Sequence, residues 1–101
     1  METKNILYID NVSKQSDTVV FKNMKIKLTN CVMEALNLLG IEHFDFVILE
    51  GPYNIKSNKK CIVNFLEKYK IPFVITPQNS FSRFKLHSRV KFLISKKIQQ
   101  Q

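Results

Sequence analysis

Five short apolar runs, separated by segments with helical spacing, dominate the pattern along the chain. They cover residues 5–10, 24–29, 46–49, 73–76 and 90–95. The first, third and fourth runs are almost uninterrupted, which is typical of strands that are covered on both faces in the middle of a parallel sheet. The second run alternates apolar residues with Lys, and the fifth contains a Lys, as edge strands tolerate. The pattern therefore predicts five strands, with the charged runs at the two edges.

A helix is predicted between the second and third runs. Its apolar residues follow the spacing i, i+3, i+4 and i+7, and they are Val32, Ala35, Leu36 and Leu39. Thr29 or Asn30 is available as the N-cap, and Gly40 is placed to end the helix. This segment is therefore predicted to connect two parallel strands.

A second helix is predicted between the third and fourth runs, with Ser57 or Asn58 as its cap. Its apolar stripe consists of Cys61, Ile62, Phe65, Leu66 and Tyr69. Shorter helices are predicted within residues 13–22 and 79–87. Both cysteines, Cys31 and Cys61, are predicted to be small core residues.

Strands that alternate with helices predict an α/β fold, a three-layer sandwich around a five-stranded parallel sheet. With the charged runs at the edges, the strand order is 2-1-3-4-5 in the order of the runs. A single domain is predicted over residues 1–98, followed by a frayed tail at 99–101. In this order the first and third strands are neighbours, and their carboxyl ends bring Asp10 and Glu50 to the topological switch point.

Five segments, taken in order, resemble the response-regulator receiver family. Residues 6–11 are similar to the family's first strand with an acidic pair, and residues 34–39 are similar to its second helix. Residues 44–50 are similar to the third strand with the phospho-acceptor, and residues 71–76 to the fourth strand with a hydroxyl residue. Residues 92–96 are similar to the fifth strand, which leads to a Lys. The resemblance implies a flavodoxin-like fold. It also implies a pocket formed by Asp10, Asn11, Glu50, Thr76 and Lys96.

Two departures from the family pattern concern the chemistry of this pocket. The family acceptor is an Asp, whereas this chain has Glu50, and displacement of a reacting group by about 1 Å can cost about 100-fold in rate. Asn11 replaces the second acid, which removes a charged ligand for a hard cation such as Mg²⁺. We therefore predict a pseudo-receiver: a non-catalytic, phosphorylation-independent signalling or scaffolding domain that binds other proteins and needs no cofactor or metal. Two alternatives are a residual ion-pair cluster with no signalling role and an active Mg²⁺-dependent acceptor that uses Glu50.

The length of the chain adds a further prediction. Receivers end with a helix after the fifth strand, and the 101 residues leave no room for one after residue 95. The last helix should therefore be missing, which leaves one face of the sheet under-covered and available to a homodimer or a partner protein. The alternative is that a rearranged first helix and the C-terminal residues cover this face.

The net charge of +8 is concentrated in the second half of the chain, which holds eleven of the sixteen basic residues and one of the eight acids. A candidate anion-binding set consists of Lys56, Lys59, Lys60, Arg83, Lys85, Arg89, Lys91 and Lys97. This set favours, as an alternative function, a small basic nucleic-acid-binding protein. A solvated basic face explains the same pattern.

Other kinds of site find little support. His43 and His87 have no partner at a recognisable catalytic spacing and are predicted to lie on the surface or in loops, so no enzyme is predicted. The two cysteines lack companions at metal-ligand spacing. No apolar run approaches the roughly 20 residues of a membrane span, so no membrane association is predicted and a soluble cytoplasmic protein is expected.

Overall fold

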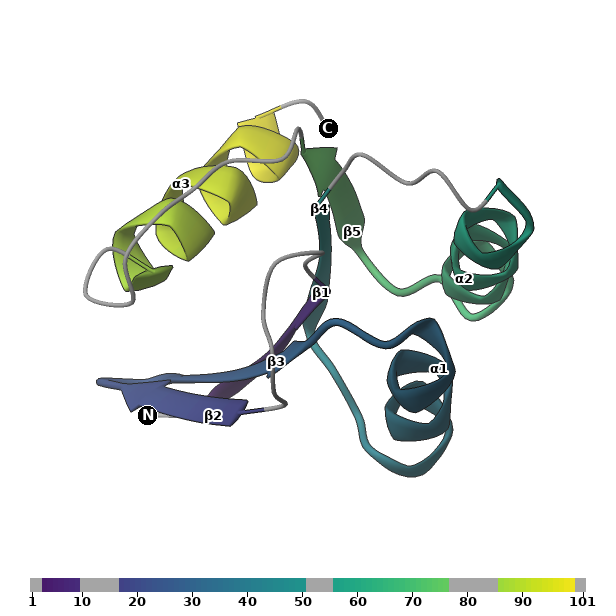
Figure 1. The fold of residues 1–101 in the computed structure, drawn as a ribbon. Coiled ribbons are helices and arrows are strands. Elements are labelled where there is room, and N and C mark those ends of the chain that lie inside the picture. Colours follow the sequence, from purple (N-terminus) through teal and green to yellow (C-terminus); the bar gives the residue numbers. More distant parts are fainter. Residues whose placement is uncertain (1–2, 10–16, 51–55, 77–85, 100–101) are drawn as a thin grey trace.

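A computed structural model describes residues 3–9, 17–50, 56–76 and 86–99 of the chain. Five strands form one sheet in the order β2-β3-β1-β4-β5 (Figure 1). Their bounds are Lys4–Ile9 for β1, Asp17–Phe21 for β2, Met24–Thr29 for β3, Phe46–Glu50 for β4 and Phe73–Thr76 for β5. The neighbours β3, β1, β4 and β5 pair in parallel, and β2 pairs antiparallel with β3.

The predicted α/β class with a five-stranded, mostly parallel sheet is confirmed. Residues 24–29, 5–9, 46–50 and 73–76 lie side by side in the order predicted for the first four runs. The chain leaves β1 toward β3 on one side and returns to β4 on the other, so the topological switch point lies between β1 and β4. The carboxyl end of β4, which carries Glu50, is therefore at the predicted place.

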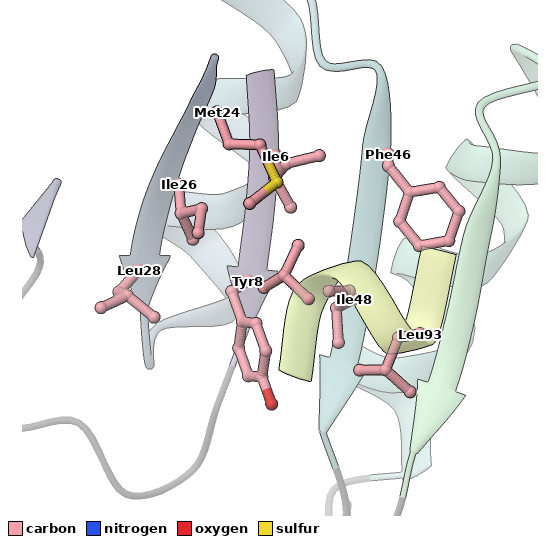
Figure 2. Packing of buried hydrophobic residues seen from close by; sticks show 9 residues of the cluster. Ile6, Tyr8, Met24, Ile26, Leu28, Phe46, Ile48 and Leu93 are labelled. Atoms are coloured by element: carbon pink, nitrogen blue, oxygen red, sulfur yellow. The ribbon is translucent and has the colours of Figure 1, made fainter. Parts of the chain in front are cut away.

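Helices cover both faces of the sheet, which confirms the predicted three layers. Helices α1 (Val32–Ile41) and α2 (Lys56–Lys68) lie on one face, and α3 (Leu86–Gln99) lies on the other (Figure 1). Because side chains of a strand alternate between faces, each strand contributes to two cores. The core under α3 contains Ile6, Tyr8, Met24, Ile26, Leu28, Phe46, Ile48, Val90 and Leu93 (Figure 2). The core under α1 and α2 contains Leu7, Ile9, Ala35, Leu39, Phe44, Val47, Leu49, Ile62 and Leu66.

The helix predicted within residues 13–22 is wrong for its described part, because residues 17–21 form β2. Val19 and Val20 are β-branched and favour a strand, and Val19 pairs with Ile26 of β3 and packs against the core under α3. Lys22 and Asn23 connect the two strands, and Lys22 has a φ of 53°. A tight hairpin connection of this kind commonly needs positive φ values.

The strand predicted at 90–95 is also wrong, because these residues lie in α3. Val90 and Leu93 are buried and Ile94 is partly buried, which is the i, i+3, i+4 spacing of a helix, while Phe92 is 63% exposed. A last helix is therefore present. This helix covers the face that was predicted to be under-covered, in agreement with the alternative in which the C-terminal residues cover it. The homodimer was predicted because this face was expected to be exposed, and that reason no longer holds.

Several local predictions for α1 and α2 need correction. Both cysteines are exposed and free, and Cys31 is the N-cap of α1 in place of Thr29 or Asn30. The Thr29 hydroxyl accepts a hydrogen bond from the Cys31 N–H at 3.2 Å. Helix α2 already includes Ser57 and Asn58, which therefore do not cap it.

Candidate functional site

Three polar side chains from neighbouring strands gather at the carboxyl edge of the sheet, under α3. Glu50 of β4 is paired in register with Thr76 of β5. Because Glu50 is two residues after Ile48, and Thr76 two residues after Val74, both side chains are on the α3 face. Tyr8 of β1 is on the same face, with its hydroxyl directed toward the carboxyl edge (Figure 2). Strand parity thus assembles a hydroxyl, a carboxylate and a phenol in one place.

Arg89 of α3 joins this group. Its Nε donates a hydrogen bond to the Tyr8 hydroxyl at 3.1 Å, and its Nη2 donates one to Thr76 Oγ1 at 3.0 Å. The Tyr8 hydroxyl also forms a side-chain hydrogen bond with Glu50. We call Tyr8, Glu50, Thr76 and Arg89 the edge cluster. It connects β1, β4 and β5 to α3 across 81 residues of sequence.

The strand residues of the edge cluster are buried. Tyr8 is fully buried, Glu50 is 1% exposed and Thr76 is 6% exposed. Burial raises the pKa of Tyr8 above its ordinary value of 10.0, and the hydrogen bond with Glu50 raises it further, against the opposing effect of Arg89. The phenol therefore remains a neutral donor toward the carboxylate at physiological pH.

A buried carboxylate is costly unless hydrogen bonds and a compensating charge accompany it. In the edge cluster the Tyr8 hydroxyl forms a hydrogen bond with Glu50, and the Arg89 guanidinium, which bonds to the same hydroxyl, carries a positive charge. At 1% exposure, the Glu50 side chain has almost no contact with solvent.

The structure brings together two of the five residues of the predicted pocket. Glu50 and Thr76 are adjacent, as predicted. Asp10 and Asn11 lie outside the described residues, and Lys96 is in α3 with a side chain that is also outside them. Within the described part of the chain, no group of three or more His, Cys, Asp or Glu side chains could hold a metal ion.

Arg89 is the cluster residue that the sequence interpretation assigned elsewhere, to the anion-binding set. The signal that could have placed it is the helical spacing of Val90, Leu93 and Ile94, which puts residue 89 beside the buried stripe. The run also contains three consecutive apolar residues, 92–94, which fit a strand as well as a helix. Such short runs do not distinguish a strand from a helix.

The candidate anion-binding set is not assembled by the described residues. Arg89 is half-buried and bonded within the edge cluster, and Lys91 is exposed. Lys56, Lys59 and Lys60 belong to α2 and Lys97 to α3, with side chains outside the described residues, and Arg83 and Lys85 lie entirely outside them.

A groove at the opposite end of the sheet was not predicted. It has a volume of about 600 Å³, lies between the C-terminal ends of α1 and α2, and has Leu39, Phe44 and Ile71 in its lining. The acidic side chains at the rim of this groove contact other residues of the protein. Glu42 forms a 2.8 Å salt bridge with Lys27, which holds the pKa of the Glu42 carboxyl below its usual range, and Asp45 contacts the exposed His43 at 3.2 Å.

Comparisons of the chain with protein-family models, with curated proteins and with solved structures find no match. In the described part of the chain, no helix is both long enough and apolar enough to cross a membrane. The function is therefore inferred from the edge cluster and from the surfaces around it.

Proposed function

We propose that the chain is a pseudo-receiver: a non-catalytic, phosphorylation-independent signalling or scaffolding domain that works by binding another protein. The observation that carries this proposal is the burial of Glu50 beneath α3, where Tyr8 and Arg89 bond around it. The side chain at the acceptor position of the resembled family is here part of the packing between sheet and helix. This burial supports a role for Glu50 in stabilising the fold.

The strand order supports the receiver part of the proposal. Strands β3, β1, β4 and β5 follow the order of the first four receiver strands, and the acceptor and hydroxyl positions, Glu50 and Thr76, are paired on adjacent strand ends. The chain departs from the pattern where β2 replaces the first helix and α3 replaces the fifth strand. These departures place Arg89 over the carboxyl edge.

The proposal can be tested by incubating the purified chain with a small phosphodonor and Mg²⁺ and measuring its intact mass. We expect no added phosphoryl group on the wild-type chain. We expect none on Glu50→Asp, because an Asp at this strand position would still lie beneath α3. An active receiver domain treated in parallel shows that the reagent works.

Incorporation of phosphate by the wild-type chain would contradict the proposal. Binding to a labelled oligonucleotide distinguishes the alternative function. We expect any retention to be lost at modest salt, whereas retention above about 150 mM salt would favour the nucleic-acid-binding protein.

A further inference from the structure

The groove between the C-terminal ends of α1 and α2 contains a residue that is unfavourable for the fold. Lys70 lines the groove just after α2 and has a φ of 57°, in the left-handed region where Gly is preferred. Its N–H donates to the Glu67 carbonyl at 3.2 Å, and the Ile71 N–H donates to the Leu66 carbonyl at 2.9 Å. This is the Schellman arrangement, which commonly has Gly at the position of Lys70. A Lys there is strained, because its Cβ crowds the backbone.

Gly40, which also lines the groove, departs from the favourable residue in the opposite direction. It lies within α1 without a positive φ, and a Cβ added there would meet nothing within 4 Å. Neither the backbone nor a close neighbour therefore requires Gly, and Gly in a helix is less stabilising than Ala. The groove has a Gly where the fold would accept a side chain, and a Lys where the fold would favour Gly. Local departures of this kind are typical of functional sites.

The lining of the groove suits a small aromatic ring. Its volume of about 600 Å³ is within the range of ligand sites in proteins. Phe44, which is 5% exposed, lines it together with Phe65 and Tyr69, whose ring centroids are 4.6 Å apart at an interplanar angle of 43°. Aromatic rings pack favourably against one another in offset and tilted arrangements. The missing side chain at Gly40 leaves the α1 side of the groove open to such a ring.

The charges around the groove favour a negative group on this ring. Both acids in the lining already have partners, because Glu42 forms a salt bridge with Lys27 and Asp45 accepts a hydrogen bond from the Asn5 N–H at 2.8 Å. The ends of both helices are closed by backbone hydrogen bonds. Within the described residues, no salt bridge engages Lys70. Its ammonium is therefore the charge in the lining that remains available to a ligand.

We propose that this groove is a binding site for a small aromatic carboxylate, with the ring against Phe65 and Tyr69 and the carboxylate at Lys70. An apolar cavity with one suitably placed charge is a common design for such ligands, in which the ring provides contact area and the charge provides orientation. The side chain of Lys70 thus compensates in binding for the strain of its backbone. The inference does not rest on the proposed function, because the groove is at the opposite end of the sheet from the edge cluster.

Three probes with the same ring test the role of charge: naphthoate, the neutral naphthamide and the cation naphthylmethylammonium. Each is titrated into the isotope-labelled full chain, and binding is followed by NMR chemical shifts. We expect naphthoate to bind most tightly. Lys70→Gly should weaken naphthoate at least about tenfold and change the affinity for naphthamide less than about twofold, since only the charged contact is lost. Lys22→Gly is the matched control, because Lys22 also has a positive φ but lies in the hairpin between β2 and β3.

Stability measurements separate binding from folding. Lys70→Gly and Lys22→Gly should both raise the midpoint of denaturant unfolding, because Gly adopts a positive φ without strain, whereas only Lys70→Gly should lose naphthoate. Gly40→Leu should fill the groove and weaken both naphthoate and naphthamide without lowering this midpoint. A wild-type chain that binds no naphthoate, or that binds naphthamide or the ammonium probe as tightly, would overturn the inference. So would naphthoate binding that is equal in Lys70→Gly and Lys22→Gly.

Discussion

The carboxylate of Glu50 is tolerated beneath α3 because neighbouring side chains stabilise it in different ways. Tyr8 contributes a neutral hydroxyl that donates to the carboxylate, and Arg89 both orients that hydroxyl and contributes positive charge. Thr76 receives a second hydrogen bond from Arg89 and so fixes the guanidinium in place. Lys could not replace Arg89 without loss, because a single ammonium group lacks the fork that reaches both hydroxyls.

The raised pKa of Tyr8 predicts how stability depends on alkaline pH. Unfolded tyrosine ionises near its ordinary pKa of 10.0, whereas folded Tyr8 holds its proton to higher pH. The contribution of Tyr8 to the free energy of unfolding is therefore complete below pH 10.0. It declines as the pH rises above 10.0, because there the unfolded chain releases the proton and folded Tyr8 still holds it.

Denaturant unfolding followed by circular dichroism at several alkaline pH values measures this effect. We expect the wild-type chain to lose stability more steeply above pH 10.0 than Tyr8→Phe does. Equal slopes for the two proteins would show that Tyr8 ionises alike in the folded and unfolded states.

Individual site residues were predictable where strand ends alone determine position. Glu50 and Thr76 could be placed together because parallel strands end at the same edge of a sheet. The place of Arg89 in the edge cluster could not be predicted, because it depends on a helix that the local pattern did not identify. The exposure of Cys31 and Cys61 was missed for a related reason. A small apolar residue next to a buried stripe can face either the core or the solvent, and its type does not distinguish the two.

At the level of elements, α3 shows how a short apolar run can be misassigned. The run 90–95 fits a strand by composition, yet its burial follows a helix, with Leu93 5% exposed and Phe92 63% exposed. Strands 46–50 and 73–76 were assigned correctly because they are bounded by polar residues or Pro and are too short for a helix. The hairpin from β2 to β3 was missed because Lys22 and Asn23 are not the Asn-Gly or Asp-Gly pair that marks such turns.

Alanine substitutions in α3 test the helical assignment. Leu93→Ala removes a side chain from the core under α3 and should lower the free energy of unfolding by about 2–4 kcal/mol. Phe92→Ala, one residue away, should cost less than about 1 kcal/mol at dilute protein concentration, because its ring is mostly in solvent. Comparable losses in denaturant unfolding would contradict the arrangement of this helix.

On the scale of the whole molecule, the edge cluster ties the last helix to the centre of the sheet. Its members come from β1, β4, β5 and α3, so the N-terminal strand and the C-terminal helix share one polar contact beneath one core. This connection explains how the chain covers its second face with a single helix. It also lies at the carboxyl edge of the sheet, beside the topological switch point.

A double-mutant cycle between Glu50→Gln and Arg89→Ala tests this account most directly, with the free energy of unfolding as the measured quantity. Breaking a buried charge arrangement from one side leaves the other charge uncompensated, so Arg89→Ala should be more costly when Glu50 is present than when it is Gln. We predict a coupling of about 1–2 kcal/mol. If Arg89→Ala cost the same in both backgrounds, Arg89 would not compensate the buried carboxylate, and the central claim that Glu50 is a structural acid would be contradicted.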